Sequence, residues 1–195
     1  MGIVRKRLSW LAALATIATA AVAALPFASQ ATTVASVTLS AGGFALINGT
    51  PAATISFPTA TLNGTSQTVT APLAVDIGDA TGSGSGWNVT ATSTTFTSAA
   101  NTLPTTATTI QSAPTAFCDP GATGCTTATT TVSYPYTLPA ATVAPTATRL
   151  FNAIANTGIG NQTFTPTWTL TIPANAVAST TAYTSTWTFS LASGP

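Results

Sequence analysis

Short runs of alternating apolar and polar residues recur along the chain after its first thirty residues. Alternation with a period of two is the pattern of a half-buried strand, and frequent threonine favours strands because its branched side chain suits a pleated surface. Clusters of Gly, Asn, Asp, Pro and Ser separate the runs and predict turns. Several strands at this spacing predict an all-β fold, a two-sheet β-sandwich of Ig-like or Greek-key type. The expected strands span residues 33–40, 53–57, 66–77, 86–96, 127–134, 163–172 and 183–191.

One segment departs from the alternating pattern. In residues 147–160, "ATRLFNAIANTGIG", the run ends at Gly158, and four apolar residues lie near helical spacing: Leu150, Phe151, Ile154 and Ala155. The pattern fits a short helix closed by a glycine, and it fits equally a strand followed by a loop.

The first 31 residues have the pattern of a signal peptide. A basic cluster, Arg5–Arg7, precedes a long apolar run, and small residues follow at Ser29 and Ala31. This order is typical of secretory signals. We expect cleavage after Ala31 and a single domain over residues 32–195, which places the protein outside the cell. The alternative is an uncleaved membrane anchor, because the apolar run nearly reaches spanning length.

Charge is scarce in the expected mature chain. Beyond the signal the chain has one cation, Arg149, and three anions, so its formal charge is 1 − 3 = −2. Nucleic-acid binding and attraction to anionic membranes both need clustered Lys and Arg, and the mature chain has no such cluster. Catalysis by acid and base needs titratable groups, and this part of the chain has no His, Glu or Lys. We therefore expect no enzyme, no catalytic residue and no cofactor.

The two cysteines, Cys118 and Cys125, enclose the turn-forming stretch "DPGATG". An exported chain meets an oxidising environment, so we expect a disulfide that staples a hairpin or a loop tip. A thiolate metal site is not expected, because two thiols without histidine cannot complete a tetrahedral shell. Asp76 and Asp79 in "DIGDATGSGSG" are spaced as in some calcium loops, but two carboxylates rarely suffice. A flexible turn that leads into Trp87 is the simpler interpretation, and we predict no metal site.

Three tryptophan triplets mark the strands: Trp87-Asn88-Val89, Trp168-Thr169-Leu170 and Trp187-Thr188-Phe189. The first follows a Gly/Ser turn, and the last lies in a Tyr183-containing strand that ends near a proline. This arrangement resembles the WxL-domain surface proteins of Gram-positive bacteria, over about the whole mature chain. Val89 and Phe189 stand where the family usually has leucine. The position of Trp187 matches the second motif better than Trp168 does, so Trp168 and Tyr183 are accessory aromatics.

The resemblance implies non-covalent attachment to the cell wall through peptidoglycan, sometimes beside other surface proteins. The internal "LPTTA" at residues 103–107 resembles a sortase signal, but no hydrophobic segment and basic tail follow it, so we expect no covalent anchor. Each tryptophan motif can fill the core or stack on sugar rings. The alternative function is that of a self-associating subunit of a surface layer or filament, in which a terminal strand pairs with a neighbour.

Overall fold

The computed structural model describes residues 33–195. Among these residues, the strands all belong to one compact unit, Leu39–Pro195. The predicted signal peptide, residues 1–31, lies outside the described residues. Residues 33–38 have no regular secondary structure, and Val34 and Val37 are exposed. The strand predicted for residues 33–40 is therefore wrong.

The unit from Leu39 to Pro195 is built from strands, and the described residues contain no helix. Accordingly, nothing in residues 33–195 forms a helix that could cross a membrane. The segment 147–160 takes the second of its two predicted forms, a strand followed by a turn. The strands are β1 (Phe44–Leu46), β2 (Gln67–Pro72), β3 (Val75–Asp79), β4 (Trp87–Thr94), β5 (Thr97–Ser98), β6 (Asn101–Thr102), β7 (Thr108–Ile110), β8 (Ala116–Cys118), β9 (Tyr136–Thr137), β10 (Ala140–Ala141), β11 (Thr148–Ala153), β12 (Gly160–Phe164), β13 (Thr167–Ile172) and β14 (Trp187–Ser193).

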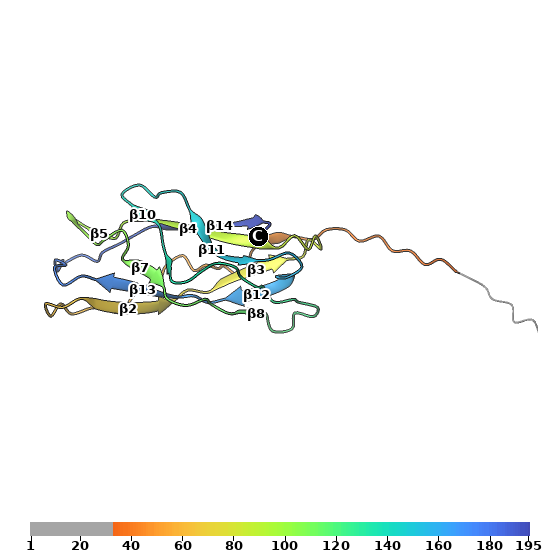
Figure 1. Cartoon of the computed structure of the whole chain (residues 1–195), viewed down its shortest axis with the longest axis horizontal. Coiled ribbons are helices and arrows are strands. Elements are labelled where there is room, and N and C mark those ends of the chain that lie inside the picture. The colour runs from red at the N-terminus through yellow and green to blue at the C-terminus, as the bar shows by residue number, and fades with distance from the viewer. Residues whose placement is uncertain (1–32) are drawn as a thin grey trace, which may run out of the picture. The chain divides into compact units, whose positions relative to one another are not determined.

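One layer of the sandwich is a long two-stranded ribbon with short strands on its flanks (Figure 1). β3 pairs with β12 and β2 pairs with β13, and the register continues across the break because Leu73 N–H donates to Pro166 C=O. The predicted strands 66–77 and 163–172 are thus each split in two. Pro166 interrupts one of them, since proline cannot donate to a ladder. β1, β7, β8 and β9 complete this layer.

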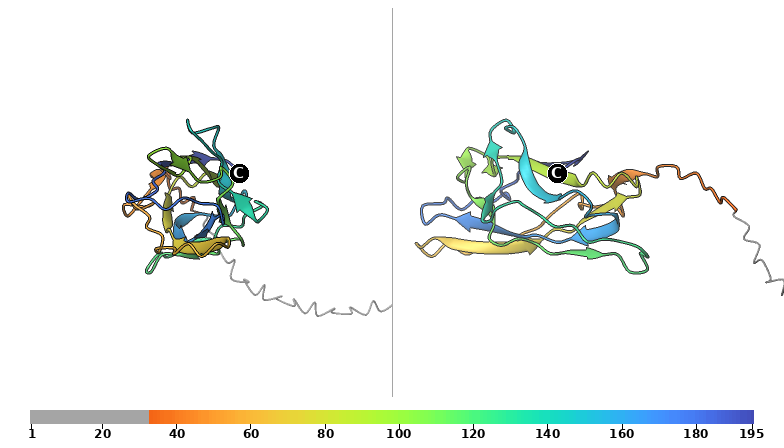
Figure 2. Two further views of the ribbon diagram at one scale, coloured as in Figure 1. Left: turned by 90° about the vertical axis from the view of Figure 1, so that its left-hand side faces the viewer. Right: turned by 45° about the vertical axis from the view of Figure 1, so that its right-hand side comes forward.

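The other layer has β4 at its centre, and Figure 2 shows it facing the ribbon layer. β14 pairs with β4 on one side, while β11 and the short β10 share the other side. Leu150 is an extra residue in β11, which breaks the register between Arg149 and Phe151. These pairings confirm the predicted all-β sandwich.

The core lies between the two layers and is aromatic. It joins buried residues of both, namely Val75, Ile77, Trp87, Val89, Phe151, Phe164 and Trp168. Two further predicted strands are wrong. Residues 53–57 and 127–134 alternate in sequence, but they form no strand, and their side chains pack on the core from coil.

Candidate functional site

The first tryptophan motif is part of the core. Trp87 and Val89 point inward from the central strand β4, and both are 0% exposed. The indole N–H of Trp87 donates to the Gly158 carbonyl at 2.8 Å, which satisfies its one polar atom. The ring packs against Phe151 and Phe164, with centroids at 6.0 and 6.5 Å. This motif has no face available to a ligand.

The second motif lies at the edge of the same layer. Trp187 and Phe189 are half-buried on β14, whose only partner strand among residues 33–195 is β4. Leu191 faces Val89 and Phe189 faces Ala91, so both motifs point to the inner side of the layer, near its opposite ends.

Trp168 supports Trp187 from beneath. Trp168 is fully buried on β13, in the opposite layer, and its ring centroid lies 4.7 Å from that of Trp187. Phe57 and Phe96 approach Trp187 from the sides, with centroids at 6.3 Å. The indole of Trp187 is therefore held in place by aromatic neighbours, while part of its surface stays open.

A groove runs beside β14 and over these aromatics. One part, about 620 Å³ in volume, lies between Trp187 and the coil that follows β1. A second part, about 850 Å³, continues it and shares Phe96, Tyr183 and Thr184 with the first. The remaining lining is mostly Thr, Ser, Ala and Pro, without any charged side chain. Tyr183 is half-buried, and its hydroxyl donates to the Val177 carbonyl at 2.7 Å.

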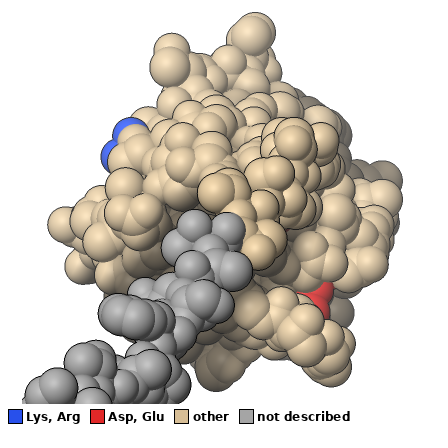
Figure 3. Space-filling model, turned by 90° about the vertical axis from the view of Figure 1, so that its right-hand side faces the viewer, with Lys and Arg blue, Asp and Glu red and all other residues tan. Residues whose placement is uncertain are grey.

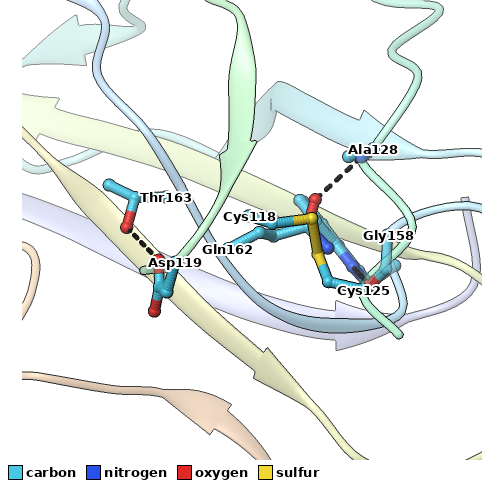
Figure 4. Close-up of a disulfide and its surroundings, with 8 residues drawn as sticks. Cys118, Asp119, Cys125, Ala128, Gly158, Gln162 and Thr163 are labelled. Atoms are coloured by element: carbon cyan, nitrogen blue, oxygen red, sulfur yellow. Dashed lines mark hydrogen bonds between the residues drawn. A yellow bond between two sulfur atoms is a disulfide. The ribbon is translucent and has the colours of Figure 1, made fainter. Parts of the chain in front are cut away.

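The disulfide and two carboxylates meet at a separate place. Cys118 and Cys125 are bonded, with a Cα–Cα distance of 5.9 Å, as the sequence predicts (Figure 4). Asp119 follows Cys118 and accepts a hydrogen bond from the Thr163 hydroxyl at 2.8 Å. Asp76, on β3, lies close enough to Asp119 for the two carboxyl groups to interact.

The pKa of the Asp76 carboxyl is raised above its ordinary value. Burial is the main cause, the hydrogen bond from Asn48 lowers the pKa, and the charge of Asp119 raises it again. Asp79 is placed differently. It is three residues from Asp76 in one strand, so the two side chains point to opposite faces. Its carboxylate accepts hydrogen bonds from the N–H and hydroxyl of Thr81, at 3.1 and 2.7 Å.

The comparison with known families decides the identity of the fold. A family model described as "WxL domain surface cell wall-binding" matches residues 22–195, which is most of the chain. The chain belongs to the WxL family. No curated protein and no solved structure shows a significant match to it. As a WxL protein it is a cell-surface protein with a cell-wall-binding domain.

The sequence gives no reason to expect the two WxL motifs to differ in exposure, but in the structure they do. Trp87 and Val89 are enclosed, whereas Trp187 and Phe189 border the groove. The coil around residues 51–55 forms the other wall of the groove, whereas the sequence predicted a strand over residues 53–57 and gave no sign of a groove. The proximity of Asp119 to Asp76 was missed as well, since no local pattern signals a contact between residues so far apart in sequence.

Proposed function

We propose that this WxL protein binds the glycan strands of peptidoglycan in the groove beside β14, and that it is a binding module without catalytic activity. The observation that carries the proposal is the half-buried Trp187, held by Trp168 below it and open on the groove side. A fixed aromatic face suits the C–H face of a sugar ring, because the ring offers a flat apolar surface whose π-face is electron-rich.

The chemistry of the lining supports a neutral, polar polymer. Threonine and serine hydroxyls, which donate and accept hydrogen bonds, line the groove together with aromatic and aliphatic side chains, and no charged side chain is among them. The two parts of the groove each fall within the range of about 300–1,000 Å³ that is typical of ligand sites. Since they adjoin, the groove suits a chain of sugars better than a single sugar. Charge is sparse beyond the groove as well, since Figure 3, which views the right-hand end of the molecule in Figure 1, shows few charged side chains.

Sedimentation with purified sacculi tests this proposal. We expect Trp187→Leu to weaken binding at least tenfold, because leucine keeps an apolar contact with Trp168 but offers no aromatic face. Phe117→Leu is the matched control, since Phe117 is 66% exposed and lies outside the groove. Circular dichroism should show that both variants are folded.

A second binding measurement, with glycan strands from which the stem peptides have been removed, tests whether the glycan or the peptide is bound. The wild-type chain should bind these strands as well as it binds sacculi. Wild-type binding by Trp187→Leu, or an equal loss in Phe117→Leu, would contradict the proposal.

We propose self-association as the second candidate function, because one edge of β14 pairs with no strand in residues 33–195. Thr94 N–H donates to Thr186 C=O and Gly194 N–H donates to Gly86 C=O, both at 2.9 Å. In an antiparallel ladder, hydrogen-bonded residue pairs alternate with pairs that exchange no hydrogen bond. Trp187, Phe189 and Leu191 belong to the second kind, so their N–H and C=O groups face away from β4. An unpaired apolar edge can accept a strand from a second copy of the chain.

Light scattering after size exclusion tests this second function. If β14 pairs between copies, we expect the mass to rise with concentration, and Thr188→Lys with Ser190→Lys to keep the chain monomeric by charge repulsion. Thr68→Lys with Thr70→Lys adds the same charge to β2, which also has one edge without a partner strand in the described part of the chain. A constant monomer mass in the wild type would exclude assembly, and an equal effect of both double variants would exclude the β14 edge as its site.

A further inference from the structure

The prediction of no metal site considered Asp76 only with Asp79; from the hollow that Asp76 shares with Asp119 on the outer face of the ribbon layer, we propose instead that this hollow binds a divalent cation of the calcium class. The hollow is lined by Asn48, Asp76, Asp119–Ala122, Asn161 and Thr163. It lies apart from the groove, since neither part of the groove includes any of these residues. Its oxygen donors are carboxylates, side-chain amides and a hydroxyl, the ligand types that calcium prefers.

The register of the strands brings these side chains to one face. Asp76 on β3 is directly opposite Thr163 on β12, and Gly78 is opposite Asn161. Asp119 extends the pairing of β8, because its N–H donates to the Asn161 carbonyl at 3.0 Å. Side chains opposite one another in a ladder share a face, so the two carboxylates and Asn161 converge.

Asp76 supplies the observation that points to a ligand. Its side chain is 4% exposed, and its Oδ1 atom is buried without a hydrogen-bond partner. The other oxygen accepts a hydrogen bond from the Asn48 amide. A buried carboxylate oxygen without a partner is costly, and a cation in the hollow would satisfy it.

The local charge also calls for a cation. Two of the three carboxylates in residues 33–195 meet here, and the one Lys or Arg of this part of the chain, Arg149, donates instead to the Pro195 carbonyl. Like charges in contact oppose ionisation unless a positive charge lies between them. No group of three or more His, Cys, Asp or Glu lies together in the described residues, so amide, hydroxyl and water oxygens would complete the shell.

Two features keep the hollow in shape. Gly78 leaves it open, because a Cβ at this position would lie 3.2 Å from the Asn161 Oδ1 atom. The disulfide closes the loop that contains Asp119 (Figure 4). Within this loop, Ala122 N–H donates to the Asp119 carbonyl at 3.0 Å. This gives the Cys118–Cys125 bond a positioning role for one of the two carboxylates.

Calcium titration of the purified chain after treatment with a chelator tests the proposal. We expect one calcium per chain by calorimetry and a rise of several degrees in Tm at millimolar calcium, relative to NaCl of equal ionic strength, since binding to the folded state stabilises it. Asp119→Asn should weaken binding at least tenfold and abolish the shift. Asp79→Asn is the matched control and should keep the wild-type calcium affinity and the rise in Tm.

The Tm measured in chelator shows whether a loss of calcium binding in Asp119→Asn comes from a less stable fold. Without calcium, Asp119→Asn should melt at or above the wild-type temperature, because it removes a like-charge contact. Absence of a calcium-specific shift in the wild type would overturn the proposal. Equal losses in Asp119→Asn and Asp79→Asn would also overturn it.

Discussion

Replacing Trp87 with alanine is expected to lower the free energy of unfolding by about 3–5 kcal/mol, the cost of removing a large aromatic side chain from a packed core. The indole is fully buried between Phe151 and Phe164, and its N–H satisfies the Gly158 carbonyl. Alanine leaves a cavity and an unpaired carbonyl. Urea unfolding followed by circular dichroism measures the loss.

Two controls define what that loss means. Trp87→Phe keeps most of the ring and removes the hydrogen bond, so it should cost about 1–3 kcal/mol for the unsatisfied carbonyl. Val143→Ala, at a side chain that is 82% exposed, should stay within about 0.5 kcal/mol of the wild type. A cost below about 1 kcal/mol for Trp87→Ala would show that the first WxL motif is not a core element.

The second large effect is expected at Gly158, which is in close contact with Trp87. Its φ of +74° is a backbone conformation that favours glycine, and a Cβ there would lie 2.5 Å from Trp87 Nε1 and would also overlap Ala153. Gly158→Ala should therefore lower the free energy of unfolding by about 2–5 kcal/mol, the sum of left-handed strain of about 1–2 kcal/mol and overpacking of about 1–3 kcal/mol.

A second glycine separates these two causes. Gly82 has a φ of +66°, and a Cβ at this position would meet no atom within 4 Å, so Gly82→Ala should show the backbone strain alone. Thermal melts of both variants measure the difference. Equal melting temperatures for Gly158→Ala and Gly82→Ala would mean that the contact with Trp87 adds nothing.

The alternating pattern predicted a strand correctly where the segment also has a partner strand to pair with. The runs at residues 86–96 and 183–191 became β4 and β14, because both place their apolar side chains on a shared core. The run at 53–57 alternates as well, yet it remains coil: Ile55 and Phe57 reach the core without a ladder. The alternation of apolar and polar residues therefore indicates which side chains are buried. Whether the segment pairs as a strand depends on residues that are distant in the sequence.

The candidate sites, too, could be predicted only in part from the sequence. That Trp187 is special could be inferred from its motif, but its openness depends on β14 being an edge strand, which no short segment encodes. Asp76 and Asp79 are close in sequence, which suggests a shared site, and strand geometry turns them apart. The partner of Asp76 is Asp119, brought near by β12, so only the three-dimensional pairing makes the acidic hollow visible.

The central position of β4 has a consequence for how the chain folds. Its neighbours, β11 and β14, are both distant in sequence, so each ladder closes a long loop before it gains any contact. Chains dominated by such non-local pairings fold slowly, in about milliseconds to seconds. Until β14 arrives, one side of β4 has no partner and the aromatic interior is open at that edge. We therefore expect partly folded chains in which β14 is still unpaired to be the most prone to aggregate, because their β4 edge and aromatic interior are exposed.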